Sequence, residues 1–108
     1  MRRGDFVTLA MQGDFGKPGP ALVVQSDSFD QHATATVLLV SSTLVDSPLF
    51  RVMVQPDDKN GLRSASQVMI DKAMTVKRDK LGDPFGSASD ALMVEVSRSL
   101  AVFLGIAR

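Results

Sequence analysis

The sequence predicts a mainly β protein, a compact and strongly bent sheet with one helix at its C-terminal end. Short apolar segments rich in β-branched residues alternate with clusters of Gly, Pro, Asn, Asp and Ser, the pattern of strands joined by turns. Only the stretch from Ser89 to Leu104 repeats its apolar residues at helical spacing. At 108 residues, the chain is expected to form one domain, residues 1–108, with a single modest core.

Five segments are expected to be strands. The first, Asp5–Met11, is rich in β-forming residues. The second, Ala21–Gln25, is apolar until its end, as in a strand that is covered on both faces. It follows a loop in which Pro18 and Pro20 stiffen the backbone. The other three are Thr34–Val40, Phe50–Val54 and Ser66–Val76, with a bend expected at Asp71-Lys72 of the last one.

The connections carry turn signals. Residues 26–32 contain turn formers without any period, and Phe29 among them is expected to pack back onto the core. Asn60-Gly61 is a strong hairpin signal. Residues 78–82 are expected to form one helical turn, and Pro84 restricts the extended piece that follows to an edge of the sheet.

The C-terminal helix is predicted from its two ends and from its apolar face. Ser87 and Asp90 have the spacing of a capping box, which satisfies free backbone amides at a helix start. Gly105 is a natural stop. The apolar face comprises Leu92, Met93, Val96, Leu100, Phe103 and Leu104.

Composition narrows the function classes. The 12 basic and 12 acidic residues balance, so net charge gives no general sign of nucleic-acid binding. There is no Cys and only one His, which argues against thiolate or His-based metal sites and cysteine nucleophiles, so no metal or cofactor is expected. No apolar run is long enough to span a membrane. The first residues lack the apolar core of a signal peptide, and we therefore expect a cytoplasmic location.

Six motifs follow one another along the chain. They are Arg3-Gly4-Asp5, the stretch Gly16-Lys17-Pro18-Gly19-Pro20 with the apolar run to Ser26, Ser42–Val52, Asn60-Gly61-Leu62-Arg63, Ser66–Lys72 and Leu100–Ile106. In these motifs the chain resembles, in register from end to end, the PemK/MazF family of toxins from toxin–antitoxin systems. The family usually has Arg between the two prolines of the loop, where this chain has Gly19.

The resemblance implies a fold and an activity. The fold would be the SH3-like barrel shared by the PemK, MazF and CcdB toxins, assembled as a homodimer. The activity would be that of a type II toxin, a metal-independent endoribonuclease that cleaves single-stranded mRNA at short motifs. In that reaction the ribose 2′-hydroxyl attacks the adjacent phosphorus. The implied partners are a cognate antitoxin, single-stranded RNA and a second copy of the chain.

The resemblance also assigns two catalytic positions. The loop Arg of the family falls on Gly19, and a Thr at the end of the central strand falls on Ser41. Arg suits this chemistry because its planar set of donors matches a phosphate. Gly19 keeps only its backbone amide, whereas Ser41 keeps a hydroxyl. The chain as written is therefore expected to fold and bind antitoxin, yet to cleave RNA slowly or not at all.

Further polar residues are candidates for binding RNA, and each also has a simpler explanation. The candidates are Lys17, Ser42, Thr43, Arg63 and Gln67. For Lys17 and Arg63, the simpler explanation is a solvated position on the surface. For Ser42 and Thr43 it is a cap on a turn, and for Gln67 it is an ordinary amide at the edge of the sheet. His32, in a loop, is a weaker candidate for general acid–base catalysis.

Two other function classes stay open. The CcdB toxins, which poison DNA gyrase, share the general fold and also end in a helix before Gly-Ile, as Gly105-Ile106 does here. They usually have a Trp before that Gly, and this chain has no Trp. A third class is a catalytically dead module that keeps the antitoxin interface. Tests of RNA cleavage, of DNA supercoiling and of antitoxin capture separate the three.

Overall fold

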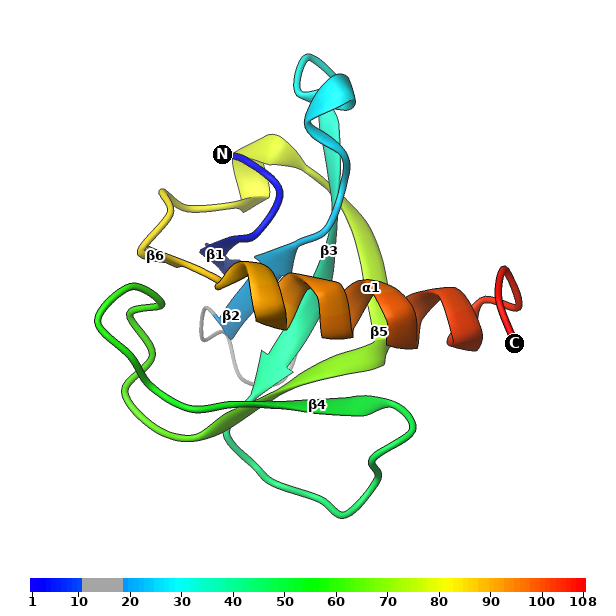
Figure 1. The fold of residues 1–108 in the computed structure, drawn as a ribbon. Coiled ribbons are helices and arrows are strands. Elements are labelled where there is room, and N and C mark those ends of the chain that lie inside the picture. Colours follow the sequence, from blue (N-terminus) through cyan, green and yellow to red (C-terminus); the bar gives the residue numbers. More distant parts are fainter. Residues whose placement is uncertain (11–18) are drawn as a thin grey trace.

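The computed structural model describes residues 1–10 and 19–108. Within these residues, one six-stranded antiparallel sheet curls around one side of a single α-helix (Figure 1). The strands are β1 (Asp5–Leu9), β2 (Gly19–Val23), β3 (Thr34–Ser41), β4 (Arg51–Val54), β5 (Ser66–Lys77) and β6 (Gly86–Ser87). The helix α1 spans Asp90–Phe103, and two 3-10 turns span Asp27–Phe29 and Arg78–Lys80. The mainly β fold with a C-terminal helix is confirmed.

The sheet has the strand order β4-β5-β3-β2-β1-β6. Its curvature comes from β5, the longest strand, which pairs with β4 through its first residues and with β3 along most of its length. Val40 of β3 pairs with Val68, whereas Leu38 pairs with Ala73, so the register shifts between these two pairs. This irregularity confirms the bend expected at Asp71-Lys72 and turns the sheet into a half-barrel.

Strand β2 begins and ends two residues earlier than the sequence predicts. It starts at Gly19 and therefore includes Pro20. The pairing with β3 begins only at Ala21, so the ladder with β3 needs no N–H group from Pro20. Strand β1 ends at Leu9, and Met11, the expected end, lies outside the described residues.

Apolar side chains cover both faces of the central strands. One core lies between the sheet and α1, which contributes the fully buried Val96. A smaller core lies on the opposite face. Leu22 belongs to the first core, and its neighbours Ala21 and Val23 belong to the second. This double coverage explains the uninterrupted apolar run of β2.

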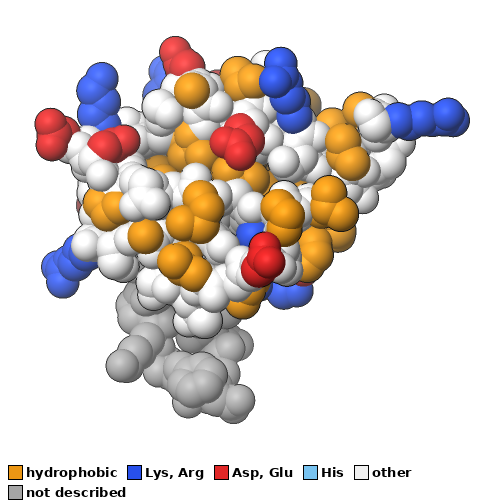
Figure 2. Space-filling view, turned by 60° about the horizontal axis from the view of Figure 1, so that its bottom comes forward, with side chains coloured by type: hydrophobic (Ala, Val, Ile, Leu, Met, Phe, Trp, Pro, Cys, Tyr) orange, Lys and Arg blue, Asp and Glu red, His pale blue; other side chains and the backbone are white. Residues whose placement is uncertain are grey.

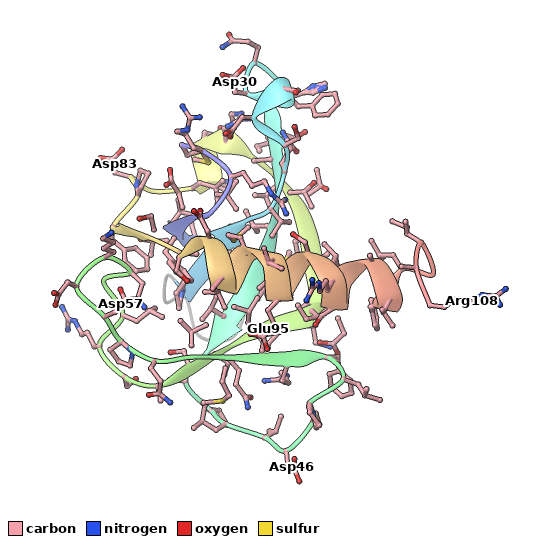
Figure 3. All side chains as sticks on the ribbon, in the orientation of Figure 1. Asp30, Asp46, Asp57, Asp83, Glu95 and Arg108 are labelled. Atoms are coloured by element: carbon pink, nitrogen blue, oxygen red, sulfur yellow. The ribbon has the colours of Figure 1, made fainter. Side chains whose placement is uncertain are left out.

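Charged side chains of the loops and of α1 lie outside these cores. In Figure 3, Asp30 and Asp46 project from loops and Glu95 projects from α1. No helix among the residues the structure describes is long and apolar enough to cross a membrane.

Two details of the connections differ from the sequence prediction. Phe29 does not pack onto the core. It is 51% exposed, and its ring instead stacks on that of His32, with ring centroids 5.3 Å apart. Asn60-Gly61 does not close a tight hairpin, because it lies within a long connection, residues 55–65. Asn60 is buried, and its side chain bonds the backbone of that connection at Asp57, Leu62 and Gln55. Gly61 supplies the positive φ of 68° that the loop requires.

The helix start also differs from the sequence prediction. Ser89, and not Ser87, is the N-cap, and its hydroxyl accepts a hydrogen bond from the Leu92 amide at 3.1 Å. Ser87 instead belongs to β6 and pairs with Asp5 of β1. The helix ends as expected, with Gly105 at a φ of +76°.

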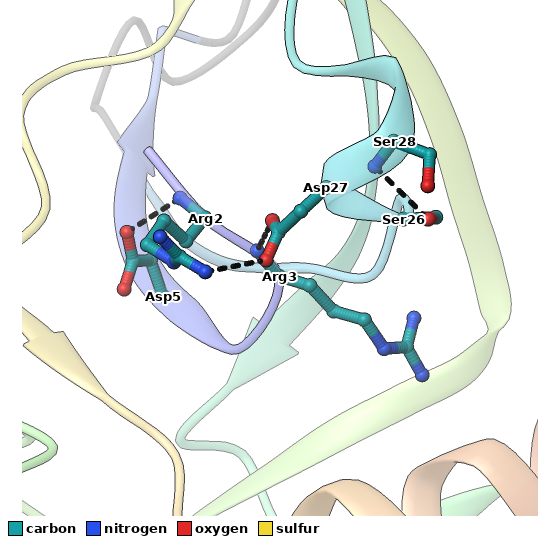
Figure 4. A network of polar contacts seen from close by, with 6 residues as sticks. All are labelled: Arg2, Arg3, Asp5, Ser26, Asp27 and Ser28. Atoms are coloured by element: carbon teal, nitrogen blue, oxygen red, sulfur yellow. Dashed lines mark hydrogen bonds and ion pairs between the residues drawn. The ribbon is translucent and has the colours of Figure 1, made fainter.

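A polar network ties the first residues to the rest of the fold (Figure 4). The Arg3 amide donates to Asp27 at 2.7 Å, and the Arg2 guanidinium pairs with the same carboxylate at 3.2 Å. The Arg3 guanidinium reaches Ser97 of α1 at 2.6 Å and also bonds the Val24 carbonyl. Arg3 therefore links the end of β2 to the helix.

Candidate functional site

A groove of about 1060 Å³ opens where β2 begins and β3 ends. Residues 61–64, in the later part of the 55–65 connection, and Phe85, just before β6, line its other sides. Its lining residues are Thr8, Gly19, Pro20, Val40, Ser41, Ser42, Gly61, Leu62, Arg63, Ser64, Ser66 and Phe85. The groove thus collects residues that lie far apart in the sequence.

The antiparallel register brings the two expected catalytic positions together. Ala21 pairs with Leu39, and continuing this register by two residues places Gly19 level with Ser41. Nothing lies within 4 Å of the position that a Cβ atom would take at Gly19. A longer side chain at this position would therefore meet open space at the groove wall.

The Ser41 side chain is half-buried and caps the turn after β3. Its hydroxyl oxygen accepts a hydrogen bond from the Thr43 amide at 3.0 Å. The contact from this hydroxyl to the Thr43 carbonyl is long, at 3.5 Å, so the hydroxyl hydrogen is held only weakly. Ser41 can accordingly donate to a ligand without losing its cap.

The other expected RNA-binding residues fall into three groups. Ser42 and Arg63 are exposed and line the groove. Thr43 and Gln67 do not line it: Thr43 bonds Ser41 through its backbone, and Gln67 is buried with its amide bonded to Val45. Lys17 lies outside the described residues. His32, the weaker acid–base candidate, stacks on Phe29 outside the groove lining.

The groove offers hydrogen-bond donors rather than metal ligands. Arg63 is the only charged residue among the described residues that line it, and hydroxyls come from Thr8, Ser41, Ser42, Ser64 and Ser66. No cluster of three or more His, Asp or Glu side chains that could hold a metal ion occurs in residues 1–10 and 19–108. A guanidinium and several hydroxyls together suit a phosphate group.

Phe85 and Leu62 of the lining were not expected from the sequence. Phe85 is 40% exposed, and its ring stacks on the fully buried Phe6 with centroids 6.2 Å apart. The sequence does hold a signal, since Phe85 stands between Pro84 and Gly86, two residue types that favour turns. An apolar aromatic residue at such a place is unusual unless it packs against something.

The pKa of one carboxyl group outside the groove, that of Asp71, is lowered. Lys72 donates a hydrogen bond to Asp71 at 2.9 Å, and this contact lowers the pKa of the Asp71 carboxyl. Partial burial opposes the shift, while the charges of Lys72 and Arg51 add to it. Asp71 lies on β5, where the strand bends.

Comparison with known proteins gives the family. The model of a family described as PemK-like, MazF-like toxin of type II toxin–antitoxin systems matches residues 2–104. The chain belongs to this family. It is 44% identical over 108 residues to a protein named Probable endoribonuclease MazF from Mycolicibacterium smegmatis, covering 99% of each chain.

Solved structures of MazF toxins have the same fold. An endoribonuclease from a mycobacterial species, in complex with its cognate antitoxin, is 26% identical, with a TM-score of 0.80 and coverage of 100% of this chain and 98% of that one. A MazE–MazF complex from Deinococcus radiodurans is 21% identical, with a TM-score of 0.78 and coverage of 99% and 98%. The half-barrel with its C-terminal helix is therefore the fold of MazF toxins.

Proposed function

We propose that this member of the PemK/MazF family is an endoribonuclease that cleaves single-stranded RNA in the groove, without a metal ion. The observation that carries the proposal is the meeting of Gly19, Ser41, Ser42 and Arg63 in one groove rich in donors. The 44% identical relative named as a probable endoribonuclease supports it.

The reaction is the one that the family resemblance implies, and the donors in the groove suit it. The 2′-hydroxyl loses its proton to water as its oxygen attacks the adjacent phosphorus. The new P–O2′ bond forms as the P–O5′ bond breaks, and the leaving 5′-oxygen takes up a proton from water. The products are a 2′,3′-cyclic phosphate and a free 5′-hydroxyl. Negative charge grows on the phosphoryl oxygens during this step, so donors aimed at them lower the barrier. The Arg63 guanidinium and the hydroxyls of Ser41 and Ser42 are the donors we assign to this task.

Gly19 makes the proposed enzyme a weak one. A Gly at this place leaves the groove wall without a side-chain donor next to Ser41. Losing one donor to the transition-state charge commonly costs on the order of a hundredfold or more in rate. We propose that the fold and the binding surfaces persist, because the open space around Gly19 imposes no packing demand.

We further propose a homodimer and an antitoxin as partners. Figure 2 shows hydrophobic side chains gathered on the face that carries β4 and the 42–50 connection. Leu44, Val45, Leu49 and Met53 are exposed hydrophobic residues of these segments, Leu49 at 85%. Exposed apolar area of this kind is typical of a surface that a partner covers. Two solved neighbours are toxin–antitoxin complexes, which supports the antitoxin.

The test of the proposed function uses a labelled pool of single-stranded RNA. The chain and its Gly19→Arg variant are incubated with the pool, with and without EDTA, and the product ends are analysed. We expect cyclic phosphate ends, unchanged by EDTA, with the variant faster. Arg63→Ala should reduce cleavage, whereas Arg98→Ala, an exposed Arg on α1, should not. RNA that is neither bound nor cleaved by either protein contradicts the proposal.

Two further assays address the alternatives. If the chain inhibits DNA supercoiling by purified gyrase, it is a CcdB-like poison. None of the relatives reported above is named as such a poison. Tight antitoxin binding by a chain that stays inactive even as Gly19→Arg would favour a dead binding module.

Antitoxin and RNA should compete for the chain, and simultaneous binding without mutual weakening would exclude a shared site.

A further inference from the structure

Phe85 places an aromatic ring in the wall of the groove. The ring is 40% exposed and shares the groove with Gly19 and Arg63. It is the only aromatic residue among the described residues that line the groove. Water therefore reaches part of an apolar ring in a groove otherwise rich in hydroxyls, and a flat ligand that covered the ring would remove this apolar area from water.

The ring is held firmly from behind. It stacks on Phe6, which is fully buried in the core, with a centroid distance of 6.2 Å and planes inclined by 30°. The Phe85 amide donates to the Phe6 carbonyl at 2.9 Å, which fixes the backbone at the same point. A rigid ring loses little conformational entropy when a flat ligand stacks on it.

The adjoining connection leaves room for this ring at Gly61. A Cβ atom at Gly61 would lie 2.9 Å from the Phe85 Cδ1 atom and 2.4 Å from the Phe85 carbonyl oxygen. The missing side chain at Gly61 thus lets the Arg63-bearing connection pass close against Phe85. The guanidinium and the aromatic ring are thereby held on one stretch of the groove.

We propose that Phe85 is a base-binding residue, on whose ring one unpaired nucleobase of the bound RNA stacks. This inference rests on the proposed function and adds to it the residue that receives a base. Proteins that bind single strands combine a cation and other phosphate donors with aromatic rings under the bases. Here Arg63 and the groove hydroxyls provide the first part, and Phe85 provides the second.

Phe29 offers a matched comparison within the same chain. It too is a half-exposed Phe, at 51%, and it stacks on a neighbouring ring, that of His32. However, it lies in the 26–32 loop and does not line the groove. If any exposed Phe bound RNA non-specifically, the two residues would behave alike.

The experiment measures binding of a single-stranded RNA selected from a random pool for tightest binding to the chain. A series of RNAs carries one abasic nucleotide each, and binding is followed by fluorescence anisotropy. We expect Phe85→Ala to weaken binding of the intact RNA by roughly 5- to 150-fold, the range for loss of one stacked base. On the abasic RNA that lacks the base stacked on Phe85, Phe85→Ala should cause no further loss of affinity. Phe85→Tyr and Phe29→Ala should bind like the unmodified chain.

Phe85→Leu is the control for loss of structure, since it keeps an apolar side chain against Phe6 while removing the aromatic ring. It should fold normally by circular dichroism and still show the position-specific loss. Equal weakening on every abasic RNA, or binding unaffected in Phe85→Ala and Phe85→Leu, overturns the inference alone. Failure of the unmodified chain and of Gly19→Arg to bind any RNA overturns the proposed function as well.

Discussion

The side-chain amide of Gln67 forms two hydrogen bonds to the backbone of Val45. Its Nε2 atom donates to the Val45 carbonyl at 2.8 Å, and its Oε1 atom accepts from the Val45 amide at 3.1 Å. Gln67 is buried on β5, whereas Val45 lies in the 42–50 connection, which has no regular strand or helix. One buried amide therefore fastens this connection, with Ser42 of the groove at its start, to the sheet.

Replacing Gln67 by Ala should loosen that connection. We expect a loss of stability on the order of 1 kcal/mol, because water can take over part of the bonding at Val45. Amide hydrogen exchange at Val45 should accelerate, while exchange in the α1 interior should not. Gln67→Glu keeps an acceptor for the Val45 amide, but it loses the donor and places a buried carboxylate against the Val45 carbonyl. Exchange at Val45 should therefore accelerate in this variant too. Unchanged exchange at Val45 in Gln67→Ala would contradict this role.

Introducing Arg at position 19 should raise RNA cleavage by on the order of a hundredfold. The reason is the open space at Gly19 and its position level with Ser41. Gly19→Met is the control, since it has similar length and no charge, and it should leave the rate unchanged. The melting temperature should be nearly the same in all three proteins. If the unmodified chain already cleaves as fast as Gly19→Arg, another group supplies the charge.

Removing the helix cap should destabilise the protein. Ser89→Ala leaves the Leu92 amide without its partner, and caps of this kind contribute about 0.5–2 kcal/mol. Ser87→Ala is the matched control, because Ser87 is exposed in β6 and does not cap the helix. Urea unfolding followed by circular dichroism gives both values. Equal losses in the two variants would exclude Ser89 as the cap.

The Asp71–Lys72 pair should make stability depend on acidity. Because the folded pKa of Asp71 is lowered, its contribution is present above the ordinary aspartate value of about 3.9 and is lost as the pH falls through the folded pKa. The stability difference between the unmodified chain and Asp71→Asn should therefore shrink in acid. Urea unfolding at several pH values measures it. Lys72→Met should reduce the effect, and high salt should weaken it.

The fold could largely be predicted from the sequence, because local patterns encode it. Both the uninterrupted apolar run of β2 and the helical spacing from Leu92 to Leu100 reflect which faces are buried. Phe103 and Leu104, expected on the same apolar face of the helix, are instead 51% and 57% exposed, because they lie beyond the part of α1 that packs on the sheet. The details that failed depend on tertiary contacts. Phe29 finds its stacking partner in His32 rather than in the core, and β6 draws Ser87 to β1, which moves the cap to Ser89.

The candidate site could be predicted only in part. The resemblance to the family pointed to Gly19 and Ser41, and the strand register explains why these two positions meet. No local pattern distinguishes Ser42, which lines the groove, from Thr43, which does not. Gln67 turns inward to Val45 because the 42–50 connection offers it a free amide and carbonyl. Phe85 joins the groove through contacts with Phe6 and Gly61, both distant in the sequence.

The shared strand β5 also bears on how fast the chain folds. It pairs with β4 near its start and with β3 along its length, and these pairs join residues as distant in sequence as Thr34 and Lys77. Neither part of the sheet can close before this strand arrives, so much loop-closure entropy is lost before pairing repays it. Folding dominated by such non-local pairing takes on the order of milliseconds to seconds. A newly made chain thus passes through a period in which the edges of β3 and β4 are unpaired.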